Sequence, residues 1–122
     1  MGDNSIGIMM GRHADIALSL YQPKTAAEAL VVLDNICKPY SNRDAEFESV
    51  DPESTNQNHP SYIDYRDPGG PLGQLIAVAF GVPGRDWVGE FSSGPEDMDD
   101  NPAYVEWWKG PCEAFNQRYN FY

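Results

Sequence analysis

The stretch TAAEALVVLDNICKP, residues 25–39, carries the strongest structural signal in this chain. Thr25 and Glu28 have the spacing of a capping box, in which the Thr25 hydroxyl accepts from the amide of residue 28 and the Glu28 carboxylate reaches back to the cap. Pro39 ends the pattern, because proline disfavours helical geometry at the preceding residue and supplies no amide donor. A helix over about 25–38 is therefore predicted. Its apolar face, with members three or four residues apart, consists of Ala26, Ala29, Leu30, Leu33, Ile36 and Cys37.

Residues 14–21, just upstream, fit two patterns. The strand pattern, in which every second residue is apolar, consists of Ala14, Ile16, Leu18 and Leu20. The helical pattern consists of Ile16, Ala17, Leu20 and Tyr21. We favour the helix, because no obvious strand partner lies nearby in the sequence, and keep the strand as the alternative.

Residues 71–80 predict another helix. Pro71 suits the first helical position, and Gly81 is the expected left-handed terminator. The face that this helix should bury consists of Leu72, Leu75, Ile76, Ala79 and Phe80.

The C-terminal residues 101–119 predict a kinked helical region. Asn101 is a good N-cap, and Pro102 fits the first helical position. One apolar stripe continues through Pro111, which indicates either one kinked helix or two helices that bend about this proline. The stripe consists of Tyr104, Val105, Trp108, Cys112, Phe115 and Tyr119. Trp107 falls off the stripe, so we expect it to be exposed, with packing against the 41–70 region as the alternative.

Residues 41–70 look irregular, because Pro52, Pro60 and a polar run over 56–59 interrupt any periodic pattern. Thirty residues without regular structure are unusual in a compact domain. We therefore expect a functional, acidic loop, or a loop that contains a short element at about 62–66.

The whole chain, residues 1–122, has the size of one small domain. Hydrophobic residues make up 41% and aromatic residues 12%, which favours a folded protein over a disordered acidic tail. Ten prolines and eleven glycines indicate short elements joined by substantial loops. The predicted fold class is mainly α, with three to four short helices and long irregular loops; α+β is the alternative.

No catalytic, cofactor or metal signature is apparent in the sequence. Cys37 and Cys112 lie on apolar helical stripes, where we expect buried thiols that act as small hydrophobic groups. The glycines at 69–73 lack the lysine of a phosphate-binding loop. The acidic run 96–100 lacks the glycine of an EF-hand calcium loop. We therefore expect no enzyme activity, no cofactor and no specific metal.

The longest apolar stretch, Leu75–Phe80, falls well short of the ~18 residues that a membrane-spanning helix needs. No basic segment followed by an apolar segment, as in a secretory signal, is visible at the N-terminus. The sequence therefore predicts a cytoplasmic protein of a host cell, without contact to a membrane.

The acidic charge is concentrated in two stretches. The chain has a net charge of −11, with 19 acidic and 8 basic residues. Residues 41–67 hold seven acids and two arginines, and residues 86–106 hold seven acids and no base. The remaining 74 residues are close to neutral, with five acids and six bases. Such a field attracts cationic surfaces and repels nucleic acid and anionic membranes.

This distribution predicts a surface that binds a basic, nucleic-acid-handling protein. Rim carboxylates would speed association, and a buried aromatic anchor would hold the complex. The candidate partner-binding residues are Glu96, Asp97, Asp99, Asp100, Glu106, Trp107, Asp44, Glu46 and Glu48.

The corresponding function is a non-enzymatic inhibitor that mimics DNA, such as a phage anti-CRISPR or anti-restriction protein. A toxin-immunity protein that neutralises a basic nuclease uses the same electrostatics and is the first alternative. A small structural or assembly protein of a phage particle is the second. Solubility or adaptation to high salt would also explain a high acid content, but it should spread the acids over all exposed faces.

Overall fold

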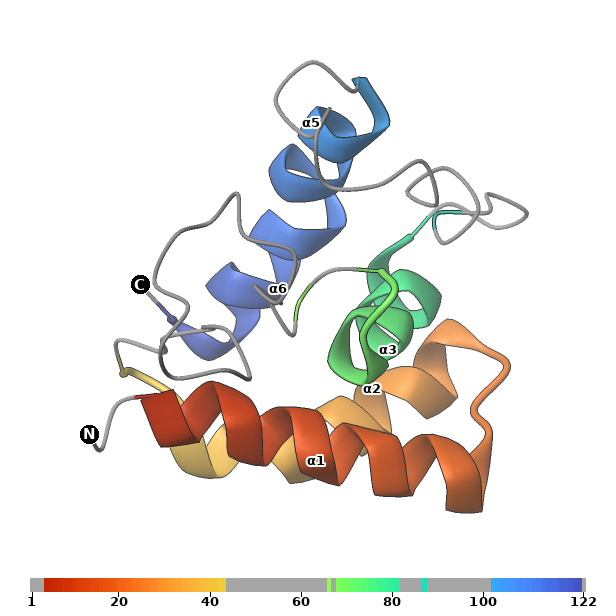
Figure 1. Cartoon of the computed structure of the whole chain (residues 1–122), viewed down its shortest axis with the longest axis vertical. Helices are drawn as coiled ribbons and strands as arrows, with labels where there is room; N and C mark the ends of the chain where they lie inside the picture. The colour runs from red at the N-terminus through yellow and green to blue at the C-terminus, as the bar shows by residue number, and fades with distance from the viewer. Residues whose placement is uncertain (1–3, 44–65, 67, 82–86, 88–101, 122) are drawn as a thin grey trace.

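The computed structural model of the chain describes residues 4–43, 66, 68–81, 87 and 102–121 (Figure 1). Those residues contain helices and turns and no strand, so the mainly α prediction is confirmed. In chain order the elements are α1 (Asn4–Tyr21), α2 (Ala26–Cys37), the 3-10 turn η1 (Lys38–Tyr40), α3 (Pro71–Phe80), α5 (Pro102–Lys109) and α6 (Pro111–Tyr119).

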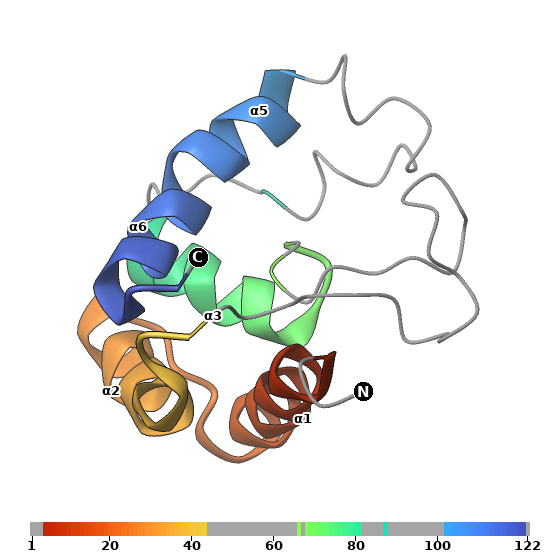
Figure 2. The ribbon, with the colours of Figure 1, turned by 90° about the vertical axis from the view of Figure 1, so that its left-hand side faces the viewer.

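The helix α3 lies at the centre of the arrangement. The helices α1 and α2 run antiparallel and side by side, and α3 packs against both of them (Figures 1 and 2). The helix α6 contacts α3, and α5, which precedes α6 in the chain, lies at the end of α6 that is away from α1. Buried side chains from α1, α2, α3, α5 and α6 join in one hydrophobic cluster, which also includes Trp87 and Phe121.

The helix α1 confirms the helical interpretation of residues 14–21 but begins ten residues earlier than predicted. Its buried side chains follow helical spacing and are Ile6, Met10, Ala14 and Ala17. Gly7 and Gly11 are also buried, and because they lack side chains a neighbouring helix can pack closely on this face. Of the helical face expected from the sequence only Ala17 is buried, whereas Ile16, Leu20 and Tyr21 lie at the surface.

The helix α2 begins and ends at the predicted signals. The Thr25 hydroxyl accepts from the Glu28 amide at 3.2 Å, as in the capping box. The Glu28 carboxylate reaches back to the cap residue and accepts from the Thr25 hydroxyl at 3.0 Å. The helix ends at Cys37, and Pro39 lies in the short turn η1 that follows.

The helix α3 has the predicted bounds, with Pro71 at its first position. The expected left-handed terminator is wrong, because Gly81 adopts an extended conformation with φ −79° and ψ 169°. Space explains the glycine instead: a Cβ at position 81 would lie 2.3 Å from the Ala77 carbonyl oxygen and 3.1 Å from Trp87 Nε1. The glycine therefore lets the chain leave α3 close to its last turn.

The C-terminal region forms two helices, as one of the two sequence interpretations predicted. Gly110 separates α5 from α6 with φ −107° and ψ −95°, and Pro111 begins α6. Two asparagines with a left-handed backbone conformation then join distant parts of the chain. Asn120 donates from Nδ2 to Asn42 Oδ1 at 2.9 Å, and the Asn42 amide donates to the Tyr119 carbonyl oxygen at 2.9 Å.

Candidate protein-binding surfaces

Most of the acidic residues proposed from the sequence lie outside the part of the chain that the structure describes. These are Asp44, Glu46, Glu48, Glu96, Asp97, Asp99 and Asp100. Glu106 is described: it lies on α5 with an exposed side chain. The last acid of the second acidic stretch is therefore at the surface of a helix that packs on the body through α6.

The expected exposure of Trp107 is wrong. Its side chain is fully buried, and its ring meets Trp87 edge-on with centroids 5.4 Å apart. The indole N–H donates to the Arg66 carbonyl oxygen at 3.0 Å. This tryptophan anchors the body and is not available to hold a partner, as the packing alternative had foreseen.

The phase of α5 relative to α6 explains the error. The sequence interpretation carried one stripe through Gly110, which made Trp107 the odd residue. The structure buries residues at four-residue spacing from α5 into α6, namely Trp107, Pro111, Phe115 and Tyr119, together with Cys112. Val105, which the predicted stripe included, is 40% exposed. This spacing of four residues was present in the sequence and could have identified Trp107 as buried.

An apolar groove runs between α1 and α2, and the sequence interpretation missed it. The groove is open and has a volume of about 560 Å³. Its floor includes the buried side chains of Ala17 and Ile36. The large apolar side chains around it are unusually exposed: Ile16 by 57%, Leu20 by 69%, Tyr21 by 67% and Val31 by 62%. Contiguous apolar surface of this kind marks an interaction site more often than chance exposure does.

Few polar groups line the groove. His13 enters it from α1, and Glu28 and Asn35 enter from α2. The carboxylate of Glu28 is held at the start of α2 by the hydroxyl of Thr25. The groove therefore offers an apolar surface with one acid that is already engaged in a cap, and it suits an apolar partner surface better than a charged one.

The segment that builds the groove is electrically neutral. Residues 4–38 contain three acids, Asp15, Glu28 and Asp34, and three bases, Arg12, Lys24 and Lys38. The net charge of this segment is zero, in a chain whose net charge is −11. The groove face is thus distinct from the two acidic stretches in composition as well as in sequence.

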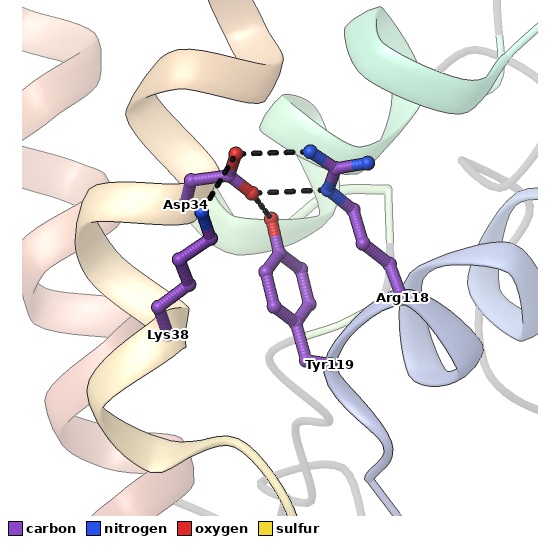
Figure 3. A network of polar contacts seen from close by, with 4 residues as sticks. All are labelled: Asp34, Lys38, Arg118 and Tyr119. Carbon is purple, nitrogen blue, oxygen red and sulfur yellow. Dashed lines mark hydrogen bonds and ion pairs between the residues drawn. The ribbon is translucent and has the colours of Figure 1, made fainter.

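A polar network joins α2 to α6 and centres on Asp34 (Figure 3). Arg118 donates to both carboxylate oxygens, from Nε at 3.0 Å and from Nη2 at 2.9 Å. The Tyr119 hydroxyl donates to Asp34 Oδ1 at 2.7 Å, and Lys38 Nζ lies 3.8 Å from Asp34 Oδ2. One carboxylate therefore links two helices through residues that are 84 and 85 positions away in sequence.

The network shifts the pKa values of Asp34 and Tyr119. The hydrogen bonds from Arg118 are the main reason why the pKa of Asp34 falls from 3.8 to about 2, although partial burial opposes the shift. Burial, followed by the bond to Asp34, raises the pKa of Tyr119 above its usual range. Burial likewise raises the pKa of Cys37. The Asp34 carboxylate already accepts hydrogen bonds on both oxygens, and the Cys37 thiol is buried and neutral. Both groups therefore suit a structural role better than proton transfer or nucleophilic attack.

Two other classes of site, metal centres and membrane-spanning helices, are absent from the described ranges. Within them, no three histidine, cysteine or acidic side chains lie close enough to hold a metal ion. No helix in these ranges is both long enough and apolar enough to cross a bilayer.

Comparison with known proteins adds no identification. The chain matches no protein-family model, and searches among curated proteins and among solved structures give no match. The function is therefore inferred from the chain's own residues.

Proposed function

We propose that this chain is a non-enzymatic inhibitor that binds a basic, nucleic-acid-handling protein through its acidic stretches. The observation that carries the proposal is the distribution of charge: residues 41–67 and 86–106 hold fourteen of the nineteen acids, and the other 74 residues are nearly neutral. Proteins that grip nucleic acid present rows of lysine and arginine, and a folded acidic protein can pair with those rows.

The helical body supports this proposal by supplying a scaffold that carries little charge of its own. The segment 4–38 is neutral, and Asp34 is paired with Arg118 and Lys38. General acidification for solubility would place acids on the exposed faces of α1 and α2 as well. Their scarcity there favours a dedicated acidic binding surface elsewhere in the chain.

The biological role that fits best is phage counter-defence, in which the chain would occupy the nucleic-acid groove of a CRISPR or restriction complex. Neutralisation of a basic nuclease toxin, as by an immunity protein, is the alternative with the same electrostatics. A structural or assembly role in a phage particle is the alternative from a different class.

The test is a pull-down from nuclease-treated host lysate at low and high salt, followed by competition. We expect a captured protein that is basic, that leaves the chain at high salt, and that, when nucleic acid is supplied to it, releases the nucleic acid as the chain is added. A captured protein that holds nucleic acid and the chain at the same time would contradict the DNA-mimic mechanism.

Charge variants sharpen the test. Asp99→Asn with Asp100→Asn removes two charges from the second acidic stretch and should lower the association rate and its salt dependence. The matched control, Asp15→Asn with Glu113→Gln, removes two charges from exposed positions outside both stretches. Equal association rates for the two variants would remove residues 96–100 from the binding surface.

A further inference from the structure

The thioether of Met9 lies at the surface of α1 and faces a hydroxyl group. The Met9 side chain is 40% exposed, whereas the neighbouring Met10 is fully buried. Tyr40 in η1 donates from its hydroxyl to Met9 Sδ at 3.9 Å, which joins the first half of α1 to the turn that follows α2. We propose that Met9 is a site of reversible oxidation to the sulfoxide, and that the Tyr40 hydroxyl captures the new oxygen.

The oxidation requires a two-electron oxidant such as hydrogen peroxide, which must reach the sulfur from solvent. A lone pair of Met9 Sδ attacks one peroxide oxygen, the O–O bond breaks and a sulfur–oxygen bond forms. The departing hydroxide takes the proton of the transferred oxygen and leaves as water. The sulfur is thereby oxidised by two electrons and the peroxide is reduced. Because the oxidant needs access, Met9 should react and the buried Met10 should be protected.

The Tyr40 hydroxyl gains a stronger acceptor when Met9 is oxidised. A thioether sulfur accepts hydrogen bonds only weakly, and the contact of 3.9 Å is long. The sulfoxide is polar, and its oxygen projects from the sulfur, so it can meet the same hydroxyl at the ordinary O–H···O distance of about 2.7–2.8 Å. Tyr40 is half-buried and packs against the hydrophobic cluster, which holds its ring in place for this bond.

The stronger bond fastens the start of α1 to the body. Gly7 and Gly11 lie in this half of the helix, and glycine is a poor helix former. The other end of the bond is anchored, because the amide of Asn42, two residues after Tyr40, donates to a carbonyl oxygen at the end of α6 at 2.9 Å. Oxidation should therefore stabilise the first half of α1, whereas a sulfoxide in a buried core disrupts packing.

The test is amide hydrogen exchange over residues 4–13 of the full chain, before and after treatment with hydrogen peroxide. We expect exchange to slow by about three- to tenfold after oxidation, as one added hydrogen bond would cause. Tyr40→Phe keeps the ring but lacks the hydroxyl, so the slowing should disappear in this variant. Met9→Leu is the matched control, because it conserves the apolar volume and reports any effect of the other methionines. Tandem mass spectrometry locates the added oxygen, and circular dichroism checks that both variants are folded.

Each outcome decides the proposal. Slower exchange in the oxidised wild-type chain, lost in both variants and reversed by the two methionine sulfoxide reductases that each reduce one epimer, supports it. Unchanged or faster exchange overturns it, as does a slowing that Tyr40→Phe retains. Oxidation of Met10 as readily as Met9 in the folded chain overturns the assignment of the site. None of these measurements involves a binding partner, so the proposal fails or succeeds separately from the proposed function.

Discussion

At the scale of single residues, Asp34 connects two helices that are far apart in the sequence, which no periodic pattern indicates. Asp34 is not part of the apolar face of α2, and its carboxylate ties α2 to α6 through Arg118 and Tyr119. Its partners are 84 and 85 residues away, so no local pattern could identify them.

The lowered pKa of Asp34 predicts a pH dependence of stability. A carboxyl whose folded pKa lies below its unfolded value stabilises the fold above the unfolded pKa and loses this effect as the pH falls through the folded pKa. The pKa values of 3.8 and about 2 place the loss between about pH 4 and about pH 2. The stabilisation is at most about 2 kcal/mol, because the side chain is partly exposed.

The measurement is the free energy of unfolding by urea for the wild-type chain and for Asp34→Asn. The difference between the two should be largest above about pH 4 and should decline toward about pH 2. A difference that stays constant over this range would show that the ionised carboxylate does not stabilise the α2–α6 contact.

Trp107 carries a second residue-scale prediction. Trp107→Ala should lower the free energy of unfolding by about 3–5 kcal/mol, because it empties a fully buried site and removes the bond to the Arg66 carbonyl oxygen. Trp107→Phe, which keeps an aromatic ring but lacks the N–H donor, should cost less. Thermal and urea unfolding measure both. If Trp107→Ala unfolds like the wild-type chain, the packing of α5 on the body is not as the structure has it.

At the scale of elements, the exit from α3 depends on a residue without a side chain. Gly81→Ala should destabilise the chain by about 1–3 kcal/mol, because the new Cβ would lie 2.3 Å from the Ala77 carbonyl oxygen and force the backbone to shift. Gly69→Ala is the control, because a Cβ there meets nothing within 4 Å. It should be neutral or slightly stabilising, since alanine restricts the unfolded chain. Equal melting temperatures for the two variants would contradict the steric account of Gly81.

The elements that the sequence predicted well are those with local start and stop signals. The capping residues around α2 and the proline and glycine around α3 fixed both helices to within a residue or two. The first half of α1 was missed because Gly7 and Gly11 are poor helix formers, and packing of α1 against α2 and α3 outweighs their cost. The exposed groove was missed because apolar spacing shows that residues share a face, not which face meets the core.

At the scale of the whole molecule, the charge of −11 predicts a response to salt. Like charges that repel in the compact state are screened by ions, so the melting temperature should rise as sodium chloride is added. Asp99→Asn with Asp100→Asn should reduce this rise, and scanning calorimetry at several salt concentrations measures it. A melting temperature that falls with salt would mean that attractive pairs, such as Asp34 with Arg118, outweigh the repulsion.

The candidate binding surface was predictable only in part. Composition located the acidic stretches, because charge can be counted along a chain. Composition could not place Trp107, which the four-residue spacing from 107 to 119 marks as buried, and no local pattern identifies its distant partners Arg66 and Trp87. The rotation of α5 about its own axis decides which of its residues are buried, and tertiary contacts set this rotation.

The placement of the two thiols has a practical consequence for the experiments above. Cys37 and Cys112 are both buried in the core, and burial holds Cys37 in its unreactive neutral form. A single cysteine introduced on the surface can therefore be modified selectively with a maleimide fluorophore while both native cysteines are kept. A donor dye on such a chain and an acceptor dye on a captured partner would report partner binding by energy transfer.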